Sequence, residues 1–527
     1  MAKILFINPV VREEDKPKHI PYGIAMLAAI AIDKNHQVQV YDANAHRLGY
    51  DIVADVVNAD DWDVIAIGGL TTTYGSIKKT VKIIKEAKPD VMIMAGGGFM
   101  TSMPLDIMSW LPEIDLGIIG EAVITFPEVL EMIDQKNFDF SSTKGVCYRD
   151  SDGNPKLTQV REILKNIDLL PYPAWDLFPL DIYFENSQLL FSEASYYAKK
   201  RIDINGSYGC SLLCKFCWHL GSIGDMVIAE DHTGKQDVQF TYGRINRYHS
   251  PKYIVDMVVD LKQRFDIDFV TFLDENLMTM DAASRRTWLA EICDLWIEAG
   301  LQPTSRRDGK SDEFNEGGVF WSGTSHANLH TPEVLKKMYE AGCSHLVYGI
   351  ESFDPAVLKN LGKGTSQRRN MEAVDTCLDS GISPIPNLII GFPEDTFEGI
   401  KITMEAMQEL GIHAKPHFAT PYPGSEWYNT YKDSILKQYD GDLEAYILDL
   451  GDATKPTVSI SHNFSQLELI GLQEIMGTRN FRLLELAREH WERTRKTGDE
   501  YAFVQPSPHF TQIKSKEKAP SVSLAAL

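Results

Sequence analysis

The first 150 residues alternate short apolar runs with longer segments of helical periodicity. The apolar runs lie at residues 4–7, 38–41, 64–67, 91–95 and 116–119. Strands that alternate with helices along a chain predict a parallel, doubly wound sheet. We therefore expect an α/β domain of flavodoxin-like, Rossmann-type fold over residues 1–150.

The expected strands of this domain end in glycines and small polar residues. Ligands of open parallel sheets bind at the carboxyl ends of the strands, and glycine permits close approach of the backbone. The candidate ligand-binding residues at these ends are Asn8, Asp42, Thr71, Thr72, Gly96, Gly97, Gly98, Gly120 and Glu121. They could hold the polar tail of a large cofactor, although glycine after a strand also serves tight turns for conformational reasons alone.

A second series of apolar runs follows a connector over residues 151–200 that contains Pro171, Pro173 and Pro179. These runs lie at residues 202–205, 269–273, 319–321, 345–350, 385–390 and 416–420. Each run except the last is followed by a helical pattern. Six such units predict an incomplete (β/α)6 barrel of TIM type over residues 201–425, with its active site at the carboxyl ends of the strands.

The end of the chain has a different pattern. Residues 426–504 predict an α-helical domain, in which Ser465 and Glu468 have the spacing of a capping box. Residues 505–527 contain prolines and lysines and few large apolar residues, which predicts a disordered tail.

Composition and charge narrow the possible functions. The chain has 527 residues, 44% of them hydrophobic, and a formal net charge of −22. An acidic surface argues against nucleic acid as a partner, because a basic surface is needed to displace counterions from phosphates. No run reaches the roughly 18 apolar residues that a membrane span requires. The start of the chain leads into a strand rather than a secretory leader, so we expect a cytoplasmic protein without an integral membrane segment.

Three cysteines, Cys210, Cys214 and Cys217, lie together just after the first expected barrel strand. Thiolates this close on one loop indicate an iron–sulfur cluster or another metal site. A cubane cluster has four irons, so three cysteines leave one iron open to a ligand that is not protein, which indicates chemistry rather than scaffolding. The remaining cysteines stand singly among apolar neighbours, which indicates core positions and a reducing compartment.

The alternative for this loop is a structural zinc site with His219 as the fourth ligand. Its spacing, Cys-x3-Cys-x2-Cys-x-His, is tighter than the two separated ligand pairs that structural zinc sites usually have. The spacing therefore favours a cluster over zinc.

The order of these features resembles the cobalamin (B12)-dependent radical S-adenosylmethionine (SAM) enzymes, methyltransferases among them. In that family the loops after the third and fourth strands, matched here by residues 68–73 and 96–99, hold the nucleotide tail of cobalamin. Other B12 proteins use Asp-x-His-x-x-Gly after the first strand to supply a histidine to cobalt. The near match around His46 begins with Asn44 and follows the second strand, so we expect His46 to be a solvated loop residue.

The resemblance continues at the ends of the later barrel strands. It implies a 4Fe-4S cluster on Cys210, Cys214 and Cys217. It also implies SAM contacts at Asp274, Glu275, Glu351, Ser352, Gly391 and Pro423. One departure is that Trp321 is followed five residues later by His326, where relatives tend to have arginine. A carboxylate-anchoring role at that position is therefore in doubt. Residues 221–251 and 302–318 look like insertions.

The activity that the resemblance implies is C-methylation. A 5′-deoxyadenosyl radical made from SAM would take hydrogen from an unactivated sp3 carbon, and methylcobalamin would supply the methyl group. The substrate would be a small molecule or a peptide or protein side chain, the glutamine of methyl-coenzyme M reductase being one possibility. An electron donor such as ferredoxin or flavodoxin would reduce the cluster.

Two other functions stay open at this stage. One is a cobalamin-dependent radical enzyme that does not methylate, such as an oxidative cyclase resembling the anaerobic magnesium-protoporphyrin ester cyclase. The other is a non-catalytic B12 or iron–sulfur sensor. The presence of SAM-type motifs at several strand ends favours an enzyme over the sensor.

Overall fold

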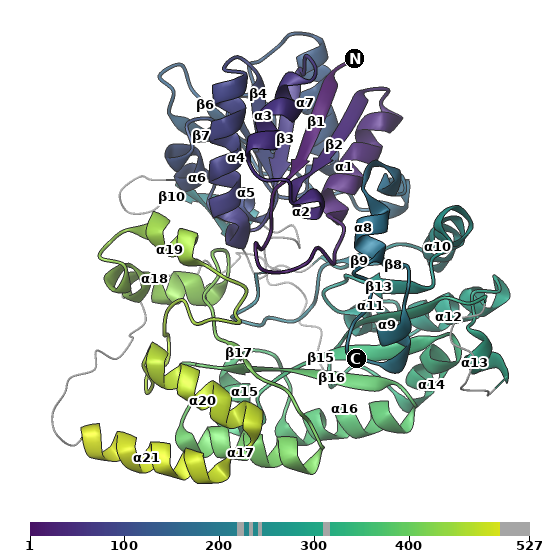
Figure 1. Cartoon of the computed structure of the whole chain (residues 1–527), viewed down its shortest axis with the longest axis vertical. Helices are drawn as coiled ribbons and strands as arrows, with labels where there is room; N and C mark the ends of the chain where they lie inside the picture. Colours follow the sequence, from purple (N-terminus) through teal and green to yellow (C-terminus); the bar gives the residue numbers. More distant parts are fainter. Residues whose placement is uncertain (219–225, 231–235, 241–244, 309–316, 496–527) are drawn as a thin grey trace.

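The computed structural model describes residues 1–218, 226–230, 236–240, 245–308 and 317–495. Figure 1 shows two α/β bodies, with the N-terminal sheet at the top, the second sheet below it and the last helices at the lower left. Among the described helices, none has both the length and the apolar character that crossing a membrane would need.

The N-terminal sheet has the strand order β2-β1-β3-β4-β5-β6-β7. Its parallel strands are β1 (Lys3–Asn8), β2 (Gln37–Asp42), β3 (Val64–Gly68), β4 (Met92–Gly96) and β5 (Leu116–Ile118). Two further strands, β6 (Val146–Arg149) and β7 (Pro155–Leu157), add an antiparallel edge that the apolar pattern did not predict. The predicted doubly wound domain is confirmed.

Helices cover both faces of this sheet, so its central strands are apolar on both sides. Ile4 and Leu5 point to opposite faces of β1, and neither is exposed to solvent. The helices on one face are α1 (Tyr22–Asp33) and α7 (Ala122–Asp134). Those on the other face are α3 (Asp51–Asn58), α4 (Tyr74–Ala87), α5 (Gly98–Ser102) and α6 (Pro104–Trp110). The carboxyl ends of the parallel strands face the second body (Figure 1).

The second sheet is parallel throughout and has the strand order β17-β16-β15-β14-β13-β8. Its strands are β8 (Arg201–Ile204), β13 (Phe269–Phe272), β14 (Phe320–Ser325), β15 (Cys343–Glu351), β16 (Ser383–Ile390) and β17 (His417–Phe418). Its helices are α10 (Pro251–Phe265), α11 (Leu277–Ala283), α12 (Trp288–Glu298), α13 (Thr304–Asp308), α14 (Pro332–Glu340), α15 (Pro355–Asn360), α16 (Gln367–Asp379) and α17 (Phe397–Glu409). Because β8 and β17 are its two edges, the sheet is an incomplete barrel, as predicted.

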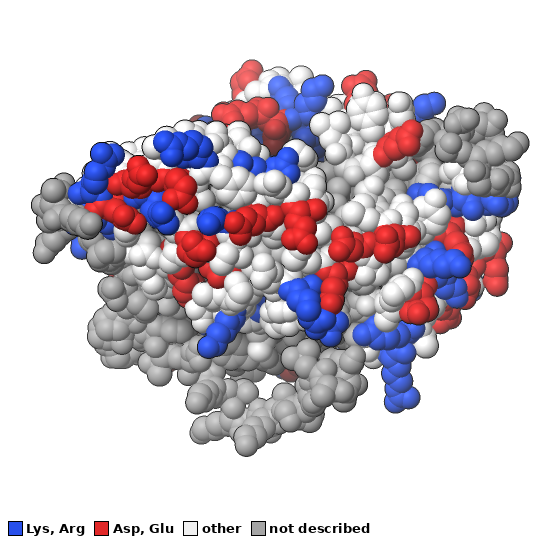
Figure 2. Space-filling view, turned by 90° about the horizontal axis from the view of Figure 1, so that it is seen from below, with Lys and Arg blue, Asp and Glu red and all other residues white. Residues whose placement is uncertain are grey.

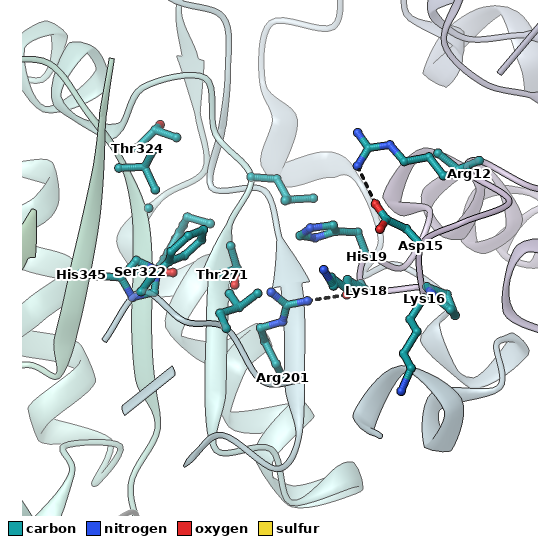
Figure 3. Close-up of a pocket in the computed structure, with 18 of the residues that line it drawn as sticks. Arg12, Asp15, Lys16, Lys18, His19, Arg201, Thr271, Ser322, Thr324 and His345 are labelled. Atoms are coloured by element: carbon teal, nitrogen blue, oxygen red, sulfur yellow. Dashed lines mark hydrogen bonds and ion pairs between the residues drawn. The ribbon is translucent and has the colours of Figure 1, made fainter. Parts of the chain in front are cut away.

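Side chains alternate between the two faces of each barrel strand. Ile202, Val270 and Trp321 lie on the outer face, in the core beneath the surrounding helices. The inner face carries polar residues and lines a cavity that Figure 3 shows: Arg201, Thr271, Ser322, Thr324 and His345.

The connector and both predicted insertions contain short elements. Helix α13 lies in the insertion at 302–318, of which residues 309–316 are outside the described residues. The connector holds η2 (Ile167–Leu169), η3 (Trp175–Leu177), α8 (Leu180–Phe184) and α9 (Glu193–Tyr197). Within the insertion at 221–251, β10 (Met226–Glu230) and β11 (Gln236–Phe240) form an antiparallel hairpin, and β12 (Arg247–Tyr248) pairs with β9 (Ser207–Tyr208). Met226 and Val238 of the hairpin pack in the same core as α4 and α6.

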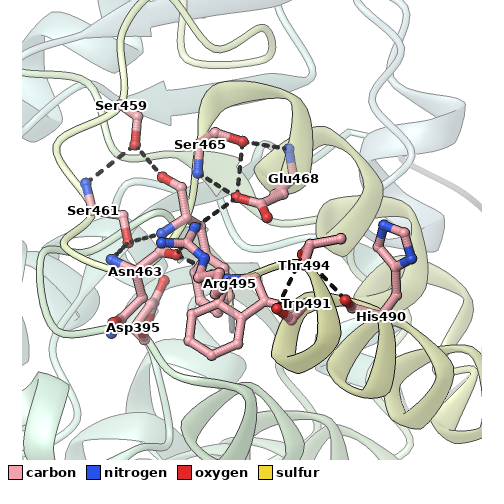
Figure 4. Close-up of polar contacts among 11 residues, drawn as sticks. Asp395, Ser459, Ser461, Asn463, Ser465, Glu468, His490, Trp491, Thr494 and Arg495 are labelled. Atoms are coloured by element: carbon pink, nitrogen blue, oxygen red, sulfur yellow. Dashed lines mark hydrogen bonds and ion pairs between the residues drawn. The ribbon is translucent and has the colours of Figure 1, made fainter. Parts of the chain in front are cut away.

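The C-terminal helices divide between the two bodies instead of sharing one core. Helices α18 (Glu426–Gln438) and α19 (Leu443–Asp449) pack with the N-terminal sheet and its helices. Helices α20 (Gln466–Thr478) and α21 (Phe481–Arg495) pack on the barrel. Figure 4 shows the polar contacts of this second pair, in which Asn463 donates to the Asp395 carbonyl and Arg495 donates to the Asn463 carbonyl. The capping box of Ser465 and Glu468 is present, and residues 505–527 lie outside the described residues.

Charged side chains of both signs are interspersed on the face that Figure 2 shows. The described residues on this face form no continuous basic surface. The distribution on this face agrees with the acidic composition of the chain.

Two buried polar contacts join the N-terminal sheet to the following segments. The Tyr183 hydroxyl, in α8, donates to Asp42 Oδ2 over 2.6 Å, while Asn8 Nδ2 donates to Asp42 Oδ1 over 2.7 Å. Arg247, in β12, forms an ion pair with Glu121 and also donates to the backbone of the connector. Burial raises the pKa of Asp42, and its hydrogen bonds with Tyr183 and Asn8 oppose that shift.

We expect Tyr183→Phe to lower the free energy of unfolding by about 1.5–3 kcal/mol, because the substitution leaves a buried Asp42 oxygen without its donor. Tyr41→Phe is the matched control, since the Tyr41 hydroxyl is buried and has no hydrogen-bond partner in the described structure. Urea unfolding of both variants measures the difference. Equal losses in the two variants would show that the contact with Asp42 does not stabilise the fold.

Candidate active site

The cysteine loop begins directly after the first barrel strand and is held at both ends. The Cys217 amide donates to the Cys214 carbonyl over 3.1 Å, which closes a turn between two of the three cysteines. The amide of Lys215 donates to the Leu361 carbonyl after α15, and its carbonyl accepts from the Trp427 amide at the start of α18. The loop is therefore fixed by segments far away in the sequence.

Asp274 and Glu275, at the end of β13, hold the start of this loop. Asp274 accepts hydrogen bonds from the Gly206 amide over 2.9 Å and from the Ser207 hydroxyl. Glu275 Oε2 accepts from the Gly209 amide over 3.2 Å. Asp274 is buried, and burial raises its pKa to about 7. Both residues were predicted to contact SAM, and in this structure their carboxylates position the cysteine loop.

Glu351 and Lys363 form a buried ion pair at the end of β15. Glu351 has φ of +64°, a left-handed conformation that costs a residue other than glycine roughly 1–3 kcal/mol. The pairing of β15 with β16 shifts register between Gly349 and Glu351, which turns the carboxylate toward Lys363. Burial lowers the pKa of Lys363, but Glu351 and Cys214 raise it, and the net pKa lies above its usual value.

The donor set of the loop fits an iron–sulfur cluster. Cys210 and Cys214 are buried, Cys217 is half-buried, and the cation of Lys363 favours thiolates nearby. Within the described residues, no three His, Cys, Asp or Glu side chains converge on a single metal ion. A cubane cluster spreads its ligands over several irons and does not need such convergence. His219, the fourth ligand of the zinc alternative, lies outside the described residues.

The strand ends of the N-terminal sheet bring two glycine loops into direct contact. Gly97 has φ of +92°, and a Cβ there would lie 2.7 Å from the Gly69 carbonyl oxygen. The Phe99 amide donates to that same carbonyl over 3.2 Å. Thr71 and Thr72 begin η1 (Thr71–Thr73), and no hydrogen bond of either hydroxyl is found within the described chain. Glycines and hydroxyls at this edge fit the polar tail of cobalamin.

Three of the predicted cobalamin-binding residues already have protein partners. Asn8 donates to Asp42, and both Asp42 oxygens accept hydrogen bonds from the protein. The Glu121 carboxylate is paired with Arg247. These side chains hold the strand ends and the connector together. Gly120, next to Glu121, has φ of +73°, and a Cβ there would meet the Met226 methyl of the hairpin at 2.5 Å.

Trp218 joins the two halves of the site, and sequence reasoning did not single it out. Its indole Nε1 donates to the Ser102 hydroxyl in α5. A Cβ at Gly98 would lie 3.3 Å from the indole ring, and a Cβ at Gly424, next to Pro423, would lie 2.6 Å from Nε1. The residue that directly follows the last cysteine thus touches the fourth strand end of the other sheet. The feature of the sequence that could have pointed to Trp218 is its position directly after Cys217.

The remaining predicted positions have local structural roles. Gly391 has φ of +96°, and its amide donates to Asp395 Oδ2 over 2.7 Å. Ser352 Oγ accepts from the Asp354 amide and contacts the Thr403 hydroxyl. Burial raises the pKa of Asp395 to about 7.

The two histidines considered above have contrasting surroundings. His326 is buried, and burial lowers its pKa to about 3, so the ring is neutral at physiological pH and supplies no charge to a carboxylate. His46 ends α2 (Ala43–His46); it is exposed, and its ring stacks on Tyr41 with centroids 6.2 Å apart.

Comparison with known families divides the chain in the same way. Residues 9–130 match the B12 binding domain, and residues 204–407 match the radical SAM superfamily. An uncharacterized methyltransferase of Pyrococcus horikoshii is 26% identical over 418 residues, which are 79% of each chain. The anaerobic magnesium-protoporphyrin IX monomethyl ester cyclase of Rubrivivax gelatinosus is 23% identical over 82% of this chain and 70% of that protein.

A solved structure has the same fold. It is the radical S-adenosylmethionine methyltransferase TsrM of Kitasatospora setae, with cobalamin and a 4Fe-4S cluster bound. The two structures align with a TM-score of 0.61 at 14% identity, over 83% of this chain and 79% of that one.

The fold and the cysteine loop define an enzyme with a B12-binding domain and a radical SAM barrel. The chain belongs to the cobalamin-dependent radical SAM enzymes, and its cofactors are a 4Fe-4S cluster, SAM and cobalamin.

We expect Asp274→Ala to weaken cluster binding, because it leaves the Gly206 amide and the Ser207 hydroxyl without an acceptor. If the free energy that favours the ordered loop falls by about 2 kcal/mol, the population of the ordered loop falls roughly 30-fold. Iron content after anaerobic reconstitution and dilution measures the effect. Asp274→Asn should retain most of the cluster, since its amide can serve both partners. Wild-type iron retention in the alanine variant would contradict this role.

The pKa of Asp395 predicts a pH dependence of stability. Its pKa is about 7 in the fold and 3.8 in a model compound, so between these values the native state holds a proton that the unfolded state loses. The wild type should therefore lose stability relative to Asp395→Asn as pH rises from 4 to 7, by at most about 1.4 kcal/mol per pH unit. Urea unfolding at several pH values tests this. A difference that does not vary with pH would show that Asp395 ionises normally in the fold.

Proposed function

We propose that this enzyme is a C-methyltransferase that acts on an unactivated sp3 carbon. The contact of Trp218 with Gly98 and Gly424 is the observation that carries the proposal. It brings the cysteine loop against the glycine-bearing strand end of the B12-binding domain. A substrate between the two sheets would face both cofactors at once. The chemistry that the bound cofactors would supply is hydrogen abstraction by a SAM-derived radical and donation of a methyl group by cobalamin.

The residues of the chain would bind and position these groups. Cys210, Cys214 and Cys217 would hold the cluster, while Asp274 and Glu275 fix the loop that carries them. Thr71 and Thr72, together with Gly96, Gly97 and Gly98, would hold the cobalamin tail. Holding the reacting groups in a fixed arrangement accounts for much of the rate that an enzyme adds to such a reaction.

A non-methylating reaction is the second candidate. The likeness to the cyclase of Rubrivivax gelatinosus extends over 82% of this chain, which is the observation that favours this candidate. The two candidates differ in whether a methyl group reaches the product. Both need a low-potential electron donor such as ferredoxin or flavodoxin, and both suit a reducing cytoplasm, which the singly placed cysteines in the cores favour.

Cys214→Ala should abolish deoxyadenosine formation, because the cluster loses one of its three ligands. Cobalamin binding should persist, since the glycine strand ends lie on the other sheet. The assay uses anaerobic protein loaded with iron, sulfide and hydroxocobalamin, supplied with methyl-deuterated SAM and a reductant. Mass spectrometry follows deoxyadenosine, and the absorption spectrum follows cobalamin.

Cys147→Ala is the control, because Cys147 is also buried but lies in β6 of the other sheet. Deuterated methylcobalamin in the wild type would support methyl transfer. Deoxyadenosine without any methylcobalamin would favour the cyclase-like reaction. A Cys214→Ala variant that still makes deoxyadenosine would contradict the role of this loop.

A further inference from the structure

A cavity of about 520 Å³ lies between the two bodies of the molecule (Figure 3). One wall is the loop between β1 and α1, from Val11 to His19, and the other is the inner face of β8, β13, β14 and β15. Small-molecule sites commonly measure about 300–1,000 Å³. None of the residues assigned above to the cluster, SAM or cobalamin lines it.

The wall formed by the N-terminal domain is basic. Its cationic lining residues are Arg12, Lys16, Lys18 and Arg47. Arg12 is paired with Asp15 and Asp452. Arg47 donates to three backbone carbonyl oxygens, which hold the guanidinium without neutralising its charge. In a chain with net charge −22, this local excess of cations favours an anionic ligand.

Arg201 is the buried cation of the opposite wall. It is 3% exposed, and its Nη2 donates to the Lys18 carbonyl. Its Nη1 is buried and has no hydrogen-bond partner among the described residues. Figure 3 shows the guanidinium beside Thr271, whose hydroxyl is also buried and without a partner in the described structure. Two unpaired polar groups on one wall are costly unless a ligand completes their hydrogen bonds.

Asp203 is a buried acidic residue on the same strand as Arg201. Burial raises its pKa, but the charges of His19 and Arg201 lower it, and the net pKa lies below its usual value. Its Oδ2 contacts His19 Nδ1 over 2.9 Å, and no ion pair to Arg201 is found within the described chain. Its Oδ1 is buried without a partner in the described residues, so it could accept a hydrogen bond from a donor on the same ligand. His345, also in the lining, is neutral at physiological pH because burial lowers its pKa to about 3.

We propose that this cavity binds the substrate through a carboxylate or phosphate group, which Arg201 and Thr271 hold by hydrogen bonds. The assignment rests on the proposed function, in which the barrel interior opens toward both cofactors. Apolar side chains in the lining would contact the rest of the molecule: Val11, Leu189, Phe191, Leu273 and Val347.

The position of Arg201 also indicates how a bound substrate would be oriented. Arg201 is the first residue of β8, whereas the cysteine loop follows the carboxyl end of that strand. Four residues of strand span about 13 Å at 3.3 Å each. A substrate anchored at Arg201 would extend along the inner face and present its opposite end to the cofactors.

Equilibrium dialysis of the cluster- and cobalamin-loaded enzyme tests the anion site. The probes are [32P]phosphate and [14C]succinate, with [14C]glycerol as the uncharged control. Saturable binding of one anion and no binding of glycerol is expected. The anion that binds more tightly tells whether the site suits phosphate or carboxylate.

Arg201→Gln should weaken binding of the preferred anion about 10- to 100-fold, as expected for a lost charge-assisted hydrogen bond. Thr271→Val should weaken it about 5-fold while the fold stays intact, because valine replaces an unpaired hydroxyl with a methyl group. Arg264→Gln, which removes the same charge from an exposed position on α10, should leave it unchanged.

The binding measurements test the anion site, and the product measurements test the proposed function. Absence of saturable anion binding, or unchanged affinity in both cavity variants, would overturn the proposal. Weaker retention of SAM in Arg201→Gln would also overturn it, because the cavity would then hold the carboxylate of SAM. Deoxyadenosine and methylcobalamin formation by the wild type are measured on the same samples. If those products form and no anion binds, the inference fails and the methyltransferase function stands. If anions bind and neither product forms, the proposed function fails.

Discussion

The packing of the Trp218 indole between the two sheets is the contact on which the active site depends. The indole donates to Ser102, and it leaves no room for a Cβ at Gly424 and little room for one at Gly98. Because Trp218 directly follows Cys217, this contact sets the distance between the cysteine loop and the B12-binding domain. Two cofactors that react with one substrate need a fixed separation, since a small misplacement of reacting groups is expensive in rate. A rigid, half-buried ring provides that separation better than a flexible side chain would.

Buried polar pairs fix the loops around this contact. Glu351 is paired with Lys363, whose charge acts on Cys214, and Glu121 is paired with Arg247 at the junction with the N-terminal sheet. Such pairs gain little net stability, because removing charges from water costs about as much as their attraction returns. Breaking one partner is nevertheless costly, so each pair strongly disfavours other arrangements of its loops. In this protein the pairs fix the positions of the loops and add little to the free energy of unfolding.

The sequence was informative where local pattern determines structure. Apolar runs between helical segments predicted both parallel sheets, because a strand covered on both faces must be apolar throughout. The antiparallel strands β6 and β7 were missed, since they are short and lie at an edge where burial is partial. Asp42 and Glu121 were expected to contact a ligand, but Tyr183 and Arg247, more than a hundred residues away, occupy their oxygens. Pairing at such separations is set by tertiary packing, which a linear pattern does not show.

The loop after β1 links the B12-binding domain to the interior of the barrel. This loop carries Arg12, Lys16, Lys18 and His19. The loop lies against the barrel, where the Lys18 carbonyl accepts a hydrogen bond from Arg201 and the His19 ring contacts Asp203. A domain that binds the cofactor thus also forms one wall of the cavity in the barrel. Because neither body encloses that cavity alone, any change in how they pack would alter the spacing of the cofactors and the shape of the cavity together.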